Sequence, residues 1–319
     1  MCSDERYDPS ALPVPHGYQL APEERRLLRS RPPAAALEWA AAAFGPGARV
    51  LHARSRRGGS SSAVHVVTVD DGRGTRHQAV LRRYVRPEVQ HEAVDLVATE
   101  AAALRLLATS SLPTPELIAA DHTGAHAGVP TVLMSLLPGR IEWAPSPAGL
   151  EPFLARLAEP LLAVSEVAVP AGTRIPVYRP YELGRALGPP PWTRLPRKVW
   201  DTAVALYQAP PPLRERRFIH RDYHPGNVLW RRGAVTGVVD WQHASLGAPE
   251  ADVGHCRVNL YWHFSAAVAD RFLRRWQAIS GRTEYHPYWD VAVVLAPPSS
   301  YGPPDAKLDE FVAAAVARL

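Results

Sequence analysis

The sequence predicts an α+β protein of two lobes, with an antiparallel sheet and one main helix first and a mostly helical part afterwards. Three observations predict this order. Strand-like segments joined by short turns rich in Gly, Ser or Asp lie in the first half of the chain. Helical periodicity dominates the second half, and Leu137-Pro138-Gly139 between the halves has the composition of a hinge. A chain of 319 residues is long enough for two such units.

The first lobe is expected to cover residues 1–137, with a helical extension over about residues 1–48. Alanine-rich residues 33–44 predict a helix that Gly45-Pro46-Gly47 ends. The elements that follow are strands over 49–54, 63–69 and 78–84, the main helix over 88–109, and strands over 116–121 and 130–136.

The second lobe is expected to cover residues 138–319. Its apolar periodicity predicts helices over 150–164, 198–207, 251–275 and 309–319. A stretch rich in Pro, Tyr and Arg over residues 169–196 is expected to follow the surface without regular structure.

Composition favours a cytoplasmic protein that acts on neither nucleic acid nor membrane. The first residues, Met1 to Arg6, are charged and lack the apolar core of a secretory signal, and no apolar run is long enough to cross a bilayer. Two cysteines cannot form a disulfide framework. Only two of the 36 basic residues are lysines, and the arginines are scattered rather than gathered in a stripe with aromatics.

The most informative segment is residues 218–230, where His220, Asp222 and Asn227 have the spacing H-R-D-x-x-x-x-N between two apolar segments. A second acid, Asp240, follows the apolar Gly237-Val238-Val239. Phosphoryl transfer requires a carboxylate that receives the proton of the acceptor hydroxyl, and oxygen ligands for magnesium on the nucleotide phosphates. Asp222, Asn227 and Asp240 could supply both from one strand-loop-strand unit.

The local form of this motif, together with Val239-Asp240-Trp241, resembles the aminoglycoside phosphotransferase/choline kinase branch of the protein-kinase-like fold. Residues 136–140 and 247–254 also resemble this branch, and the resemblance extends from about Leu51 to Asp290. It implies a two-lobed kinase-like enzyme that uses Mg²⁺ with ATP or GTP. The acceptor it implies is a hydroxyl of a small molecule, a class that includes antibiotics such as aminoglycosides and related hydroxylated metabolites.

The resemblance also implies a role for each motif residue. Asp222 would be the catalytic base, and Asn227 and Asp240 would hold magnesium against the nucleotide phosphates. His220 would brace the catalytic loop, and Asp252 would support that loop from below.

On the nucleotide side, the resemblance implies that the turn Gly58-Gly59-Ser60-Ser61 covers the phosphates, where small side chains let backbone amides approach. The strand Lys of protein kinases is absent, and Arg82 stands in the matching place with Glu100 as its expected partner and Glu92 as the second choice. A guanidinium can bind phosphate and carboxylate in bidentate fashion.

Other interpretations remain open at this point. The Gly/Ser turn could be an ordinary hairpin, and Arg82 could lie on a solvated strand edge. Because of Arg82, the chain could also be a nucleotide-binding pseudokinase that serves as a scaffold. A remote alternative is an iron oxygenase in which His220 and Asp222 ligate the metal with His243 or His255.

The acceptor is the least determined part. Residues 140–217 are net basic, which makes a strongly cationic antibiotic a less favoured substrate. Acids that could still line a pocket are Glu182, Asp270 and Asp290. Four aromatic residues could form a pocket wall, although core packing is the more frequent role of such residues: Tyr261, Trp262, Tyr288 and Trp289.

Overall fold

The structure is a computed structural model. It describes residues 20–56, 61–143, 145–180, 187–189, 193–295 and 306–319. Gly58, Gly59 and Ser60 of the expected phosphate-covering turn, and Glu182, lie outside the described residues.

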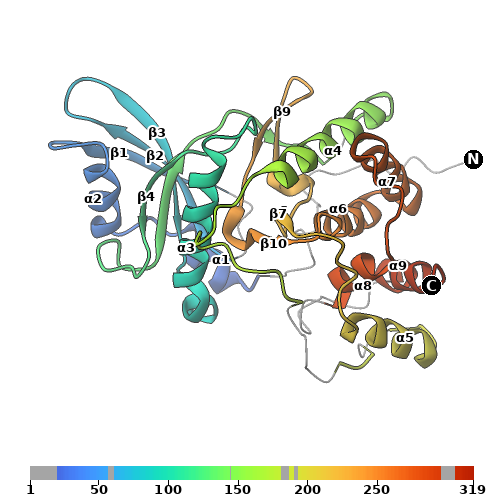
Figure 1. Ribbon diagram of the computed structural model, residues 1–319. Helices are drawn as coiled ribbons and strands as arrows, with labels where there is room; N and C mark the ends of the chain where they lie inside the picture. The colour runs from blue at the N-terminus through green and yellow to red at the C-terminus, as the bar shows by residue number, and fades with distance from the viewer. Residues whose placement is uncertain (1–19, 57–60, 144, 181–186, 190–192, 296–305) are drawn as a thin grey trace, which may run out of the picture.

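An antiparallel sheet with strand order β1-β2-β3-β5-β4 forms the first part of the molecule (Figure 1). Its strands are β1 (Arg49–Ser55), β2 (Ala63–Asp70), β3 (Arg76–Arg83), β4 (Leu117–Asp121) and β5 (Thr131–Ser135). The helices of this part are α1 (Pro22–Arg29), α2 (Ala34–Ala42), the short η2 (Pro87–Val89) and α3 (Gln90–Leu107).

α2 covers one face of the sheet and α3 covers the other. Side chains alternate along each strand, so successive residues are directed to the two helices in turn. Ala79 and Leu81 of β3 pack with Ala40 of α2 in one apolar cluster. Val80, between them, belongs with α3 to the main core of the molecule. Arg82 has the same parity as Val80, so its side chain is directed toward α3 and away from α2.

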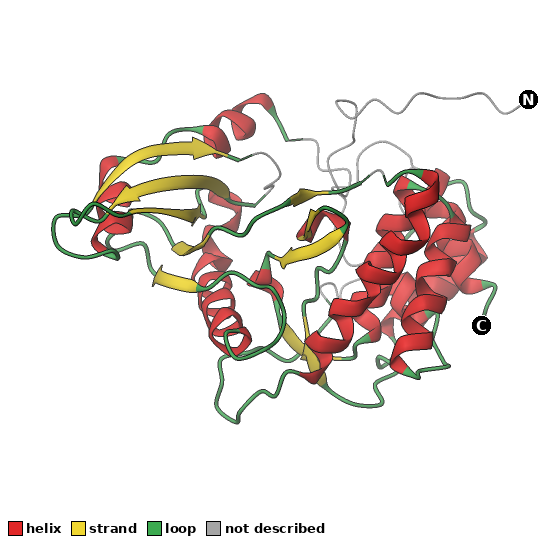
Figure 2. Ribbon diagram, turned by 90° about the horizontal axis from the view of Figure 1, so that it is seen from above, coloured by secondary structure: helices red, strands yellow, loops and turns green. Residues whose placement is uncertain are grey.

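The second part is mostly helical, and its helices lie together at the opposite end from the sheet (Figure 2). They are α4 (Leu150–Glu166), α5 (Arg197–Gln208), α6 (Glu250–His263), α7 (Ala266–Ser280), α8 (Tyr288–Leu295) and α9 (Ala306–Val316), with the short η3 (Pro147–Gly149) before α4. α6 packs against α7 and α8, and α4 packs against α7.

Two small sheets lie between β5 and the helices of the second part. β6 (Arg140–Ile141), β8 (Val228–Arg231) and β9 (Ala234–Val238) form one, and β7 (Arg217–Ile219) and β10 (Ser245–Gly247) form the other. The short turn η4 (Pro225–Asn227) forms the end of the connection between β7 and β8, and the short turn η5 (Trp241–His243) follows Asp240.

The predicted α+β kinase-like class is confirmed, and the structure corrects one helix. The segment expected to be a single helix over 251–275 forms α6 and α7, with a break at Phe264 and Ser265. The Ser265 side chain accepts a hydrogen bond from the Val268 backbone N–H and so begins a new helix. No helix in the described ranges is long and apolar enough to cross a membrane.

Both parts of the molecule share one continuous core, which determines where a site can lie. Tyr84 and Leu104 from the sheet side belong to the same buried cluster as Phe218 and Trp241. α3 packs directly on the η5 turn that follows Asp240. Residues of α3 and β3 are therefore brought next to Asp240.

Candidate active site

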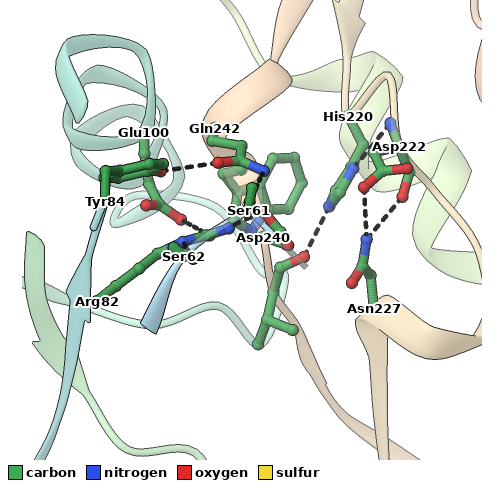
Figure 3. A network of polar contacts seen from close by, with 12 residues as sticks. Ser61, Ser62, Arg82, Tyr84, Glu100, His220, Asp222, Asn227, Asp240 and Gln242 are labelled. Carbon is green, nitrogen blue, oxygen red and sulfur yellow. Dashed lines mark hydrogen bonds and ion pairs between the residues drawn. The ribbon is translucent and has the colours of Figure 1, made fainter. Parts of the chain in front are cut away.

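The loop expected to be catalytic is the connection between β7 and β8, and Figure 3 shows its polar contacts. The carboxylate of Asp252 on α6 accepts the backbone N–H of His220 at 2.8 Å and that of Arg221 at 2.5 Å. Arg221 has a backbone φ of 69°, a left-handed conformation that residues other than glycine rarely adopt. Asp252 thus holds the loop in an unfavourable but specific conformation, which is the geometry that a supporting role requires.

His220 directs both ring nitrogens at the backbone. Its Nε2 lies 2.8 Å from the carbonyl oxygen of Val239, and its Nδ1 accepts the N–H of Asp222 at 3.2 Å. A metal ligand would need one of these nitrogens, and both are engaged in bracing the loop. The iron site that combines His220 with Asp222 therefore finds no support in this geometry.

Asn227 is oriented by Asp222. Its Nδ2 donates to the backbone oxygen of Asp222 at 2.8 Å and lies 3.2 Å from Oδ2 of the same residue. The amide oxygen consequently points away from Asp222, as Figure 3 shows. The backbone oxygen of Asn227 accepts the N–H of Val239 at 2.9 Å, so Asn227 and Asp240 lie at the same end of the β8–β9 hairpin.

These two residues fit a magnesium ion by their chemistry. An amide oxygen and a carboxylate are hard oxygen donors, and Mg²⁺ usually takes only one or two such protein ligands beside water and substrate phosphates. The Asp240 side chain retains 27% of its exposure, which leaves room for water and phosphate. Asp240 has φ of 72°, a left-handed conformation typical of functional turns.

Arg82 is buried at the centre of a charged network and does not lie on a solvated strand edge (Figure 3). Its Nη1 lies 2.9 Å from Glu100 Oε1 and 2.8 Å from Asp240 Oδ1, while its Nε donates to Ser62 Oγ at 2.9 Å. Glu92, the second-choice partner, instead lies near His91 at the surface.

The protonation states in this network follow from burial and charge. Burial opposes the charge of Arg82, but the carboxylates of Asp240 and Glu100 outweigh it and raise the pKa of the guanidinium. Burial raises the pKa of Glu100, and the Arg82 charge partly offsets this effect. A permanently charged guanidinium thus faces the position where phosphates would lie against Asp240.

Replacement of Arg82 tests this network. The lysine side chain ends in a single ammonium nitrogen and cannot contact Ser62, Glu100 and Asp240 together. We expect Arg82→Lys to raise the nucleotide KM about tenfold, and Arg82→Met to lower the free energy of unfolding by about 3 kcal/mol because buried carboxylates lose their counter-charge. Nucleotide titration and urea unfolding measure the two effects. Arg83→Met is the matched control on the same strand, and an equal effect there would contradict the assignment.

Three residues of this site were not singled out in the sequence. Ser62 bonds Arg82, and the Tyr84 hydroxyl donates to Gln242 Oε1 at 2.8 Å. Gln242 Nε2 lies 3.5 Å from the hydroxyl of Ser61, the described member of the expected phosphate turn. Strand parity could have identified Ser62. This residue lies directly before β2 and has the same parity as Val64, which pairs with Arg82 on β3, so the side chains of Ser62 and Arg82 are directed to the same face of the sheet. No local signal marks Gln242.

The acids and aromatics considered for the acceptor pocket have structural roles where they are described. Asp290 is fully buried and bonds Arg257 at 3.0 Å, and Asp270 lies 3.1 Å from the same guanidinium. Tyr261, Tyr288 and Trp289 belong to the core, and Trp262 packs at its border. These acids are neutralised by arginine and do not form an open acidic wall.

Trp143 and His263 lie against each other with tilted rings whose centroids are 4.1 Å apart, and the burial of His263 predicts a pH effect. Burial, assisted by Lys307, lowers the pKa of His263 to about 4 from 6.5. A lowered histidine pKa stabilises the fold above pH 6.5, and this contribution is lost as pH falls toward 4. We expect His263→Gln to abolish about 3 kcal/mol of this acid sensitivity, measured by urea unfolding at pH 7 and pH 4. The same pH dependence in both proteins would contradict it.

Fold and site together define a kinase-like phosphotransferase. Residues 52–288 match the model of the phosphotransferase enzyme family, and the chain belongs to that family. It is accordingly a phosphotransferase. No curated protein matches the sequence.

Solved structures show the same fold at low sequence identity. A thermostable mutant of aminoglycoside phosphotransferase APH(4)-Ia, in complex with ADP and hygromycin B, has 16% identity and a TM-score of 0.54 over 84% of this chain and 94% of its own. Macrolide 2'-phosphotransferase MphH from Brachybacterium faecium has 18% identity and a TM-score of 0.54 over 88% of this chain and 96% of its own. APH(2")-IIIa with GDP and kanamycin has 19% identity and a TM-score of 0.53 over 78% and 84%.

Proposed function

We propose that this protein transfers the γ-phosphoryl group of ATP or GTP to a hydroxyl of a small molecule. The observation that carries the proposal is the Arg82–Asp240 contact of 2.8 Å, because it joins β3 on the nucleotide side to Asp240, which lies at the same end of the β8–β9 hairpin as Asn227. In this assignment Asp222 receives the hydroxyl proton. Asn227 and Asp240 hold Mg²⁺, which would neutralise charge on the phosphates.

The nucleotide would lie between the sheet and the catalytic loop. Arg82, held by Glu100, would bind phosphate oxygens, and the turn that ends at Ser61 would cover them. Catalysis would then rest on alignment and on electrostatic stabilisation without a covalent intermediate. His220 and Asp252 keep the loop in place through the backbone contacts described above.

The acceptor belongs to the class of hydroxylated metabolites and antibiotics, including aminoglycosides and macrolides. The structural relatives in complex with hygromycin B and kanamycin support an antibiotic as acceptor. The Arg257 pairing of Asp270 and Asp290 supports a less cationic molecule, because those acids are not free to bind ammonium groups. A role in antibiotic resistance in the cytoplasm is part of the same proposal.

The test is a direct transfer experiment. The protein is incubated with Mg·ATP or Mg·GTP and a panel that contains aminoglycosides, macrolides, amino alcohols and neutral sugars. Mass spectrometry then detects one added phosphoryl group on one acceptor class. Nucleotide binding without transfer to any member, and without hydrolysis, would favour a scaffold over the proposed kinase.

A further inference from the structure

Two histidines that have no assigned role in the proposed phosphoryl transfer lie against the Asp222 carboxylate. His255 on α6 places Nε2 2.9 Å from Asp222 Oδ1, and His224 Nε2 lies 3.8 Å from the same oxygen. Within the described part of the chain, these three residues form the one group whose ligand atoms are close enough together for a metal ion, all within 4.8 Å.

The tautomer of His224 argues against a metal at this place. Its Nδ1 accepts the backbone N–H of Gly226 at 3.0 Å, so the lone pair is on Nδ1 and the hydrogen of the neutral ring is on Nε2. A metal ligand would need the opposite arrangement at Nε2. Gly226 fits tightly against this ring, since a Cβ there would lie 2.6 Å from His224 Cε1, and the ring has little room to turn.

Because metal binding is not favoured here, the position of His255 is better explained by its direct contact with Asp222. An imidazole lone pair and a carboxylate lone pair would repel each other at 2.9 Å, so Nε2 of His255 carries a hydrogen. The second oxygen of Asp222 is close to the Asn227 amide at 3.2 Å. The two carboxylate oxygens are thus held from two different elements, the catalytic loop and α6.

The first two turns of α6 contact both the backbone of the loop and the side chain of Asp222. Asp252 and His255 are three residues apart and share one face of the helix. Asp252 fixes the backbone of His220 and Arg221, while His255 contacts the carboxylate of Asp222. One rigid element thereby sets where the loop lies and how its carboxylate is turned.

We propose that His255 is a positioning residue that holds the Asp222 carboxylate toward the acceptor hydroxyl. This inference rests on the proposed phosphoryl transfer. Without the His255 contact, Asp222 can rotate about its side-chain bonds, and fewer molecules have the base aligned with the hydroxyl. The nucleotide contacts of Arg82 and Asp240 do not involve His255, so the effect falls on turnover and leaves nucleotide binding unchanged.

The test compares His255→Gln with His255→Leu. The Gln amide reaches the position of Nε2 and can donate to Asp222, whereas Leu fills space without a donor. We expect the Leu variant to lose about tenfold to a hundredfold in kcat with an unchanged nucleotide KM, and the Gln variant to regain most of the loss. His263→Gln, two turns further along α6, is the control and keeps wild-type kcat. Equal kcat for wild type and Leu, or no rescue by Gln, would overturn the proposal.

A second measurement separates this inference from the proposed function. Absence of phosphoryl transfer by the wild-type protein would contradict the proposed function, whatever His255 does. Crystal structures of the wild-type protein and the Leu variant then decide the inference without activity. A single Asp222 side-chain conformation in the wild type, with a changed or mixed one in the Leu variant, supports it. The same Asp222 conformation in both contradicts it.

Discussion

Asp222→Asn is expected to lower the rate of phosphoryl transfer by about 10²- to 10⁴-fold while nucleotide binding is retained. Asparagine has the same shape and can keep the contact with Asn227, but it cannot accept the proton of the acceptor hydroxyl. Steady-state kinetics with the acceptor found in the transfer experiment measure the loss, and calorimetry with Mg·nucleotide measures binding.

Asp201→Asn on the exposed face of α5 is the matched control, because it makes the same chemical change away from the site. It should have wild-type kinetics. A rate within a fewfold of wild type for Asp222→Asn would remove Asp222 from its proposed role as base. Loss of nucleotide binding in the same variant would instead indicate that Asp222 acts in holding the metal.

Asp240→Asn is expected to reduce Mg²⁺-dependent turnover by about 10³-fold or more, because a metal that stabilises transferring phosphate contributes several kcal/mol. Asn is preferred to Ala here, since Asn tolerates the left-handed conformation that Asp240 adopts. The loss of charge also leaves Arg82 with Glu100 as its remaining carboxylate. Affinity for Mg·nucleotide should therefore fall more than affinity for metal-free nucleotide.

Calorimetric titration with and without Mg²⁺ separates these two affinities. Asp270→Asn provides the control, because Asp270 also pairs with an arginine but lies far along the chain from the catalytic loop. Its turnover and Mg²⁺ dependence should match those of the wild type. Unchanged Mg²⁺-dependent turnover in Asp240→Asn would exclude Asp240 as a metal ligand in the proposed mechanism.

Much of the fold was predictable because its signals are local. Alternating strands joined by short turns predicted β1, β2 and β3 within a few residues of their observed ends. The helix break at Phe264 and Ser265 was missed, because the apolar periodicity continues across it and only the Ser265 cap marks it. The short helix α8 was also not predicted, since eight residues give a weak periodic signal.

The sequence by itself determined the reaction class, because the spacing of His220, Asp222 and Asn227 within one short loop leaves them close together whatever the rest of the chain does. It also indicated Arg82. This residue lies far along the chain from His220, Asp222 and Asn227, but the strand that carries it is recognisable in the sequence. Tertiary structure decided what the sequence left open. The packing of α3 directs Glu100, the expected partner, and not Glu92 to Arg82. The packing of α6 brings His255 to Asp222, because it selects one helical face for this contact, and helical periodicity does not specify what that face will meet.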